Sequence, residues 1–172
     1  MANTYTLIAS NTLSTTAASV TFSSIPSTYT DLVLRMSARN DRAVTNGTLN
    51  LTINNLSTSI YSWTFLQGNG SAASSNRNSA TTFLSDIPLV GSSATSNTFS
   101  SIEIYLPSYL ASQNKPVGIF GVNETNATAI EMKANAGLIQ STAAIDRIDI
   151  SNTSTFQFVS GSSFFLYGIK NS

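Results

Sequence analysis

Apolar and polar residues alternate along most of the chain, in short segments bounded by Gly, Pro, Asn and Ser. In "LVLRMSAR" (32–39) every second residue is apolar, and Arg35 and Arg39 lie among the residues between them. An alternation with a period of two is typical of a strand that buries one face. The same reasoning predicts strands at 5–10, 18–23, 48–54, 60–67, 81–90, 98–107, 116–124, 129–139, 143–151, 155–160 and 161–170.

These segments predict an all-β protein. No stretch combines a 3.6-residue period with helix-capping residues, and no linker or change in composition divides the chain. Short strands at regular spacing are typical of antiparallel sandwiches and barrels. We therefore expect residues 1–172 to form a single antiparallel β-sandwich with a jelly-roll-like arrangement.

The segments between the strands indicate where the chain turns. Asn46 and Gly47 form a dipeptide favoured in tight turns. Residues 68–80, "GNGSAASSNRNSA", have no period and only small or polar side chains, so we expect a surface loop. Pro88 interrupts 81–90, which predicts a short strand or an edge segment there.

The strand predicted at 129–139 has a clear polar side. Glu131, Lys133 and Asn135 alternate with small or apolar residues. Charged residues are rarely buried without partners, so we expect these three side chains to face solvent.

Two predicted strands, 117–123 and 164–169, are apolar on both faces. A sandwich covers one face of each strand with the opposite sheet, so the other face needs a second copy or an overlying loop. We expect homo-oligomer or partner contacts on the second face, at Phe120, Val122, Phe165, Tyr167 and Ile169.

The stretch "RNDR" (39–42) has the highest density of charge in the chain. Arg39 and Arg42 are candidates for the same contact, because arginine is enriched in interfaces and its guanidinium forks onto carboxylates and carbonyls. A solvated turn with a local ion pair is the alternative.

Charged residues make up only 9% of the chain, against about 25% in average soluble domains. Ser, Thr and Asn together supply 68 of the 172 residues, so the polar surface consists of hydroxyls and amides. Eight basic and eight acidic residues cancel, and no 18 apolar residues run together. We therefore expect neither nucleic acid nor a membrane as a partner, and the N-terminus shows no signal-peptide pattern.

The chain contains no Cys and no His. These absences exclude thiolate nucleophiles, zinc–thiolate sites and an imidazole base. Asp146 and Asp149 could suggest a calcium site, but on one strand they point to opposite faces, which favours pairing with Arg147. We expect no enzyme activity, no cofactor and no metal.

Two aromatic groups could instead stack on sugar rings. Tyr61, Trp63 and Phe65 share one face of their strand, for which core packing is the favoured interpretation. Tyr105 and Tyr109 flank Pro107 and form the second group.

Three stretches, in the order in which they occur, resemble a group of tailed-bacteriophage virion proteins: "TFSSIPSTYTDLVLRMSAR" (21–39), "FLQGNGSAASSNRNSATTFL" (65–84), and "STAAIDRIDI" with "GSSFFLYGIK" (141–150, 161–170). The positions that match its first pattern are Ile25, Pro26, Thr28, Tyr29, Asp31 and Leu32, and those that match its last are Phe164, Leu166, Tyr167, Gly168 and Ile169. The resemblance implies a fold and a virion setting and no active site.

Residues and resemblance together lead to one expected function and one alternative. The expectation is a decoration or cement protein on the virion, a trimer that binds the major capsid protein and stabilises its lattice. The alternative is a tail-fibre or tail-tip domain that recognises a host glycan, for which the 68–80 segment and its aromatic neighbours are the motivation.

Overall fold

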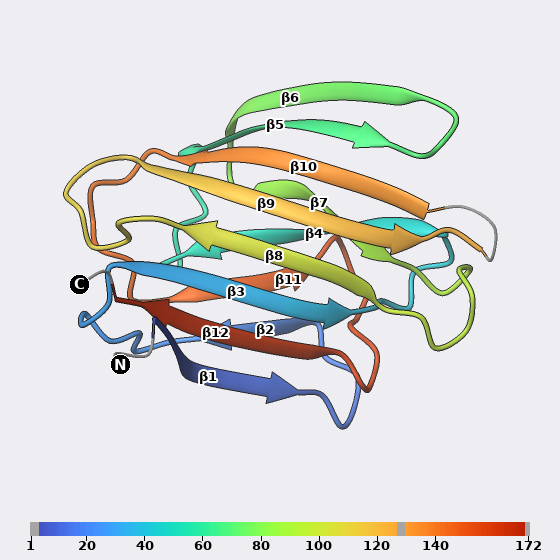
Figure 1. Ribbon diagram of the computed structural model, residues 1–172, viewed down its shortest axis with the longest axis horizontal. Coiled ribbons are helices and arrows are strands. Elements are labelled where there is room, and N and C mark those ends of the chain that lie inside the picture. The colour runs from blue at the N-terminus through green and yellow to red at the C-terminus, as the bar shows by residue number, and fades with distance from the viewer. Residues whose placement is uncertain (1–3, 127–129, 171–172) are drawn as a thin grey trace.

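The computed structural model describes residues 4–126 and 130–170, and the described chain forms antiparallel strands (Figure 1). The strands are β1 (Tyr5–Thr12), β2 (Ser19–Phe22), β3 (Asp31–Ala38), β4 (Asn46–Ile53), β5 (Tyr61–Gly68), β6 (Ala73–Thr81), β7 (Leu84–Val90), β8 (Ser100–Leu106), β9 (Lys115–Glu124), β10 (Ile130–Ile139), β11 (Ile148–Asn152) and β12 (Ser163–Ile169). The all-β prediction is confirmed.

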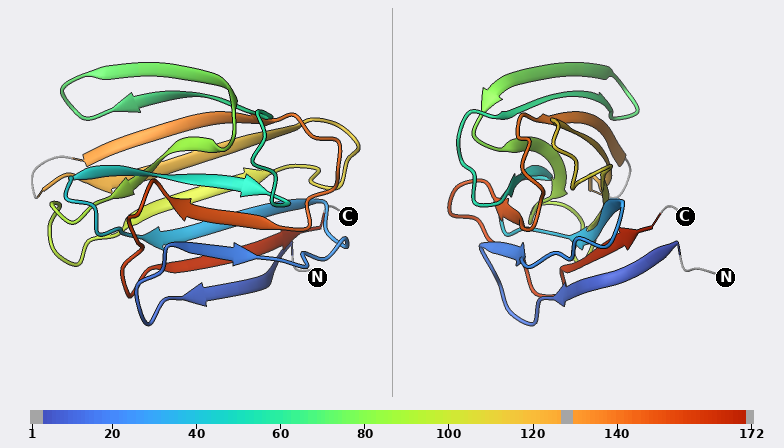
Figure 2. Two further views of the ribbon diagram at one scale, coloured as in Figure 1. Left: turned by 180° about the vertical axis from the view of Figure 1, so that it is seen from behind. Right: turned by 90° about the vertical axis from the view of Figure 1, so that its left-hand side faces the viewer.

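Two sheets of unequal width face each other. The larger has eight strands in the order β1-β12-β3-β8-β9-β10-β5-β6, and the smaller has four in the order β2-β11-β4-β7. Seen from behind in Figure 2, β2, β4 and β11 lie in front of the larger sheet. The arrangement is that of a β-sandwich. A jelly roll has two sheets of four strands, whereas these sheets have eight and four, so the expected jelly roll is not confirmed.

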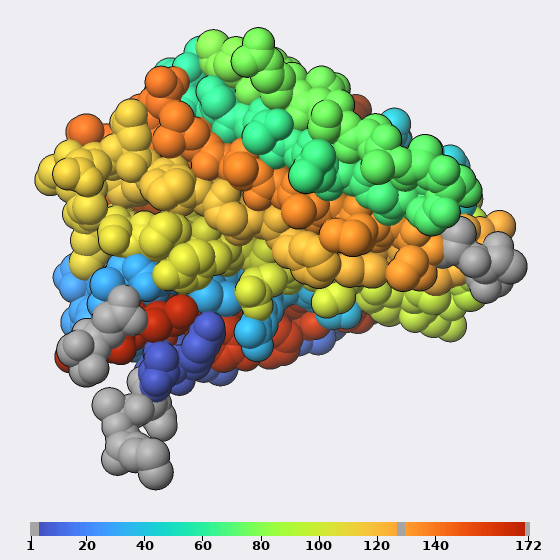
Figure 3. Space-filling model, turned by 45° about the horizontal axis from the view of Figure 1, so that its top comes forward, coloured from blue at the N-terminus to red at the C-terminus, as the bar shows by residue number. Residues whose placement is uncertain are grey.

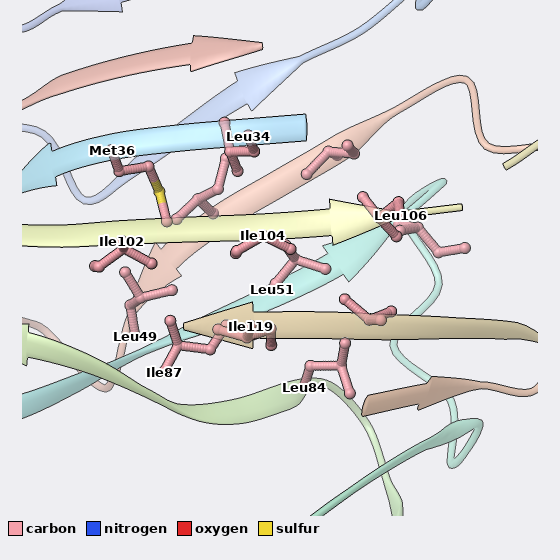
Figure 4. Packing of buried hydrophobic residues seen from close by; sticks show 14 of the residues in the cluster. Leu34, Met36, Leu49, Leu51, Leu84, Ile87, Ile102, Ile104, Leu106 and Ile119 are labelled. Atoms are coloured by element: carbon pink, nitrogen blue, oxygen red, sulfur yellow. The ribbon is translucent and has the colours of Figure 1, made fainter. Parts of the chain in front are cut away.

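The core lies between the sheets and consists of aliphatic residues from both. Leu34 and Ile104 on the larger sheet and Leu51 and Ile87 on the smaller sheet have no exposed surface (Figure 4). Alternation predicts this facing for β3 and β8, and Arg35 and Glu103 on the opposite face are exposed.

Three sequence predictions about loops and strands are wrong. Most of the loop predicted at 68–80 is strand β6, which pairs with β5 although all but the last of its residues are exposed. Asn46 and Gly47 begin β4 rather than form a turn. Residues 155–160 form no strand, and Phe158 makes only isolated bridges to Ala17 and Asn40.

Pro88 lies on β7, which forms an edge of the smaller sheet. The prediction of an edge segment at 81–90 is therefore confirmed. An edge strand tolerates proline because its outer backbone groups have no partner strand.

Candidate interaction surface

Over residues 130–138, strand β10 presents its polar residues to the interior and its large apolar residues to solvent. Glu131, Lys133 and Asn135 are each about nineteen-twentieths buried, with exposed fractions of 6%, 5% and 5%. Met132 and Leu138, on the opposite face, are 45% and 36% exposed. The prediction that the three polar side chains face solvent is wrong, and the outward face of β10 is apolar instead.

The buried polar residues of β10 find polar partners on three other strands. Asn46 of β4 and Gln67 of β5 both donate to Glu131 Oε2, at 3.0 and 2.9 Å. Burial raises the pKa of Glu131, and the positive charge of Lys133 partly offsets that rise. The inward orientation is thus stabilised by hydrogen bonds that a solvent-facing strand would not need.

Lys133 and Asn135 face one residue of the smaller sheet. Asn135 Nδ2 donates to the backbone carbonyl of Asp86 at 3.0 Å, and Lys133 Nζ lies 3.6 Å from Asp86 Oδ1. Lys133 Nζ also lies 4.2 Å from the centre of the Phe65 ring. The two contacts with Asp86 join β10 of the larger sheet to β7 of the smaller sheet.

On the outer side of the larger sheet, the exposed apolar residues of β5, β9 and β10 form one continuous surface. In register, Ala134 of β10 lies between Phe120 of β9 and Leu66 of β5, and Met132 lies beside Val122. We call this surface the outer apolar patch; its residues are Leu66, Phe120, Val122, Ile130, Met132, Ala134, Ala136 and Leu138. Figure 3 shows β9, β10 and the β5–β6 hairpin as adjacent bands across one face of the molecule.

No member of the outer apolar patch is charged, and its most exposed side chains are large. Leu66 is 67% exposed, Ile130 64% and Phe120 48%. Contiguous exposed apolar surface of this kind marks interaction sites in soluble proteins.

The second apolar region of this face lies at its other end and is better covered. Phe165 and Tyr167 of β12 are half-buried, because β12 lies between β1 and β3. The Tyr5 ring contacts that of Tyr167 edge-on, with 6.4 Å between centroids. Residues of the same chain therefore cover part of the outer face of β12.

A charged pair separates the two apolar regions. Arg35 Nε of β3 donates to Glu103 Oε2 of β8 at 2.8 Å. These two side chains line a shallow depression together with Phe120 and Phe165. The structure thus brings two of the predicted contact residues, Phe120 of β9 and Phe165 of β12, to one site, although β3 and β8 lie between their strands.

Two predicted contact residues are buried within the chain, and we correct their assignment. Arg39 is 8% exposed, and its guanidinium donates to four backbone carbonyls, those of Ser92, Ala94, Thr95 and Thr98, at 2.7–3.2 Å. Ile169 is only 7% exposed. Neither side chain is available at the surface of one copy, because packing within the chain already occupies it.

Arg42 lies elsewhere, in the connection between β3 and β4. Its guanidinium carbon is 5.4 Å from the centre of the Phe156 ring, and its backbone carbonyl accepts from Ser92. The structure therefore does not bring Arg42 together with the outer apolar patch.

The aromatic groups considered for sugar stacking do not form platforms. Tyr61, Trp63 and Phe65 face the interior, with at most 9% of any side chain exposed, which confirms the core-packing prediction. Tyr109 is fully buried and donates to the Pro26 carbonyl, whereas Tyr105 is exposed and donates to Asp31.

Three acidic residues of the described chain, Asp86, Glu103 and Asp149, form ion pairs. Arg147 Nη2 lies 2.6 Å from Asp149 Oδ1, as the sequence predicts. Among residues 4–126 and 130–170 no three His, Cys, Asp or Glu side chains come together as metal ligands would. Over the same ranges no helix has the length and apolar character needed to cross a membrane.

Sequence reasoning missed four large residues of the outer apolar patch: Leu66, Ile130, Met132 and Leu138. The signal was present in the alternation of 129–139, where the positions of Ile130, Met132 and Leu138 share one face. The facing was misjudged because Glu131 and Lys133 argued for solvent on the other side.

Comparison of the chain with protein-family models, curated proteins and solved structures found no match.

Proposed function

We propose that the chain is a non-enzymatic structural protein of a bacteriophage virion, a capsid decoration protein that self-associates through the outer apolar patch. The observation that carries the proposal is the orientation of strand β10 over residues 130–138, where Glu131, Lys133 and Asn135 are inside and the large apolar side chains are outside. A strand with this orientation leaves apolar surface in water unless another molecule covers it.

The dimensions of the outer apolar patch suit a second copy of the chain. β9 and β10 are ten residues long, and at about 3.3 Å per residue each is about 33 Å long. Three strands spaced about 4.8 Å apart cover a width of about 15 Å, which gives a footprint of about 500 Å². Two such footprints total about 1,000 Å², the lower bound for a specific interface.

The chemistry of the patch also favours self-association. Without charged members it offers no electrostatic preference, so an equally apolar surface is its best complement. Every copy carries such a surface, and closed symmetry lets one patch serve all copies. A trimer is the form that we expect.

The virion setting rests on the resemblance of three stretches to tailed-phage virion proteins. Structural roles suit the matching positions: Leu32, Phe164 and Leu166 are fully buried in the core. In the proposed mechanism, each oligomer bridges neighbouring major capsid subunits and adds contact area across their seams. Binding to the mature lattice then favours that lattice by mass action.

The test is binding of labelled protein to purified virions, expanded empty capsids and isolated tails. We expect saturable binding to expanded capsids and higher resistance of those capsids to heat. Binding to tails alone would overturn the capsid assignment and favour the recognition of a host glycan. Binding to none of the three would overturn the virion proposal.

A further inference from the structure

Lys133 and Asp86 occupy an unusual position between the two sheets. Lys133 points inward from β10 and is 5% exposed, with the Phe65 ring 4.2 Å from its Nζ. Asp86 lies on β7, and its Oδ1 is 3.6 Å from that nitrogen. An amine and a carboxyl group from opposite sheets therefore lie next to each other beside an aromatic ring.

We propose that Lys133 and Asp86 condense to an intramolecular amide that covalently joins β10 to β7. Lys133 Nζ, after losing a proton, attacks Asp86 Cγ, which is one bond from the oxygen 3.6 Å away. The Nζ–Cγ bond forms, the bond from Cγ to one carboxyl oxygen breaks, and one water molecule leaves. The ammonium and the carboxylate together supply the two hydrogens and the oxygen of that water, so nothing is oxidised or reduced and no co-reactant is needed.

Proximity is the first reason for the reaction to proceed. Reacting atoms held at about 3–3.5 Å gain a large effective concentration. Lys133 Nζ lies 3.6 Å from Asp86 Oδ1, the oxygen bonded to the carbon that it would attack. The fold holds Asp86 in place, since its carbonyl accepts from Asn135 of β10 at 3.0 Å. The reacting residues are thus fixed by the same strands that the amide would join.

Burial supplies the second reason. The Lys133 side chain is only 6% exposed, so its ammonium carries a desolvation penalty, whereas the Asp86 side chain is 32% exposed and the product amide is neutral. The Phe65 ring beside Lys133 excludes water from one side of the amine. Condensation therefore removes the charge of an ammonium that the site solvates poorly.

We assign the transfer of the proton from the attacking nitrogen to the leaving oxygen to Glu131, two residues before Lys133 in the sequence. It shares the inward face of β10 with Lys133, and Asn46 and Gln67 hold its Oε2. Because burial raises its pKa, this carboxyl group takes up a proton more readily than an exposed one.

A second buried lysine provides a matched control. Lys115 is 1% exposed, but its Nζ donates to the backbone carbonyls of Ala111, Gln113 and Ser141 at 2.9–3.0 Å. No carboxylate accepts a hydrogen bond from it among the described residues. Lys115 should therefore remain a free amine.

The experiment is intact-mass spectrometry of the purified full-length chain, followed by sequencing of its proteolytic fragments. We expect a mass lower than that of the sequence by one water molecule, and a branched fragment that joins residue 86 to residue 133. The Lys133→Arg and Asp86→Ala variants should have their full sequence masses, whereas Lys115→Arg should keep the deficit. On denaturing gels, wild type should migrate faster than Lys133→Arg.

Two results would overturn the cross-link: a wild-type chain with its full sequence mass, or a mass deficit that persists in Lys133→Arg. The wild-type fragments decide the matter even if a variant fails to fold. For the proton carrier, Glu131→Gln should slow the appearance of the deficit after cell-free synthesis at least 10-fold, whereas Glu103→Gln should not. An unchanged rate in Glu131→Gln would overturn the role of Glu131.

Discussion

Met132 and Lys133 are consecutive residues of β10, yet Met132 is 45% exposed and Lys133 is 5% exposed. The apolar side chain lies on the outer face of the larger sheet, and the charged side chain lies between the sheets. Asp86, Asn46 and Gln67 provide polar partners for the inner face of this strand. Within residues 4–126 and 130–170, no such polar partners meet the outer face, and from this difference we infer an assembly surface.

The buried guanidinium of Arg39 should stabilise the fold of a single copy of the chain. Its fork donates to four carbonyls of the segment before β8, and lysine cannot reproduce that geometry. We expect Arg39→Lys to lower the free energy of unfolding by about 2–4 kcal/mol, because buried carbonyls lose their donors. Urea denaturation measures this change.

The matched control is Arg35→Lys. Arg35 pairs with Glu103 on the exposed face, and such pairs contribute less than about 1 kcal/mol. Equal losses in the two variants would contradict the structural role of Arg39.

Gly168 of β12 packs directly against the ring of Tyr29. A Cβ added there would overlap the ring of Tyr29, whereas one added at Gly118 would meet no atom within 4 Å. We expect Gly168→Ala to lower the free energy of unfolding by about 1–3 kcal/mol through overpacking. Gly118→Ala should leave it unchanged or slightly raised in the same denaturation assay, and a reversed order would show that Tyr29 does not cover β12.

Glu131 should make stability depend on pH. Burial raises its pKa above the ordinary value of 4.5, so the folded chain keeps this proton at pH values where the unfolded chain has lost it. Its contribution to stability is present below pH 4.5 and is lost as the pH rises through the folded pKa. Replacement by Gln removes the loss, so the stability of Glu131→Gln relative to its parent should increase from about pH 4 to about pH 7.

Thermal unfolding at several pH values measures this effect. Both chains should carry Asp86→Ala, so that neither can form the amide. For Glu103→Gln in the same background, the free energy of unfolding relative to the parent should change by less than about 1 kcal/mol over that pH range, because Glu103 is exposed. A relative stability of Glu131→Gln that falls with rising pH would contradict the inferred burial of Glu131.

The sequence predicts the fold class and the facing of β3 and β8 because their two faces differ clearly in polarity. It fails for β10, since a period of two defines two faces without saying which one is inside. Glu131 and Lys133 face inward because partners distant in sequence, Asn46, Gln67 and Asp86, meet them there. Such long-range pairing leaves no local signal.

The sequence-based prediction fails for strand β6 for a different reason. Both of its faces are exposed and polar, so its sequence carries no period at all. Only its backbone pairing with β5 makes it a strand. Of the candidate site, Phe120 and Val122 could be predicted from the doubly apolar β9, whereas Leu66 and Met132 required knowledge of the facing of their strands.

Self-association through the outer apolar patch is tested most directly by sedimentation equilibrium at micromolar concentration. The wild-type chain is compared with Met132→Lys and Ser19→Lys. Met132→Lys places a charge in the outer apolar patch, and Ser19→Lys places the same charge on the exposed side of β2 in the smaller sheet. We predict a multiple of 18.2 kDa for wild type and Ser19→Lys, and a dissociation constant raised at least 100-fold in Met132→Lys. A wild-type chain that sediments as a single 18.2 kDa species would show that the outer apolar patch does not join copies of the chain.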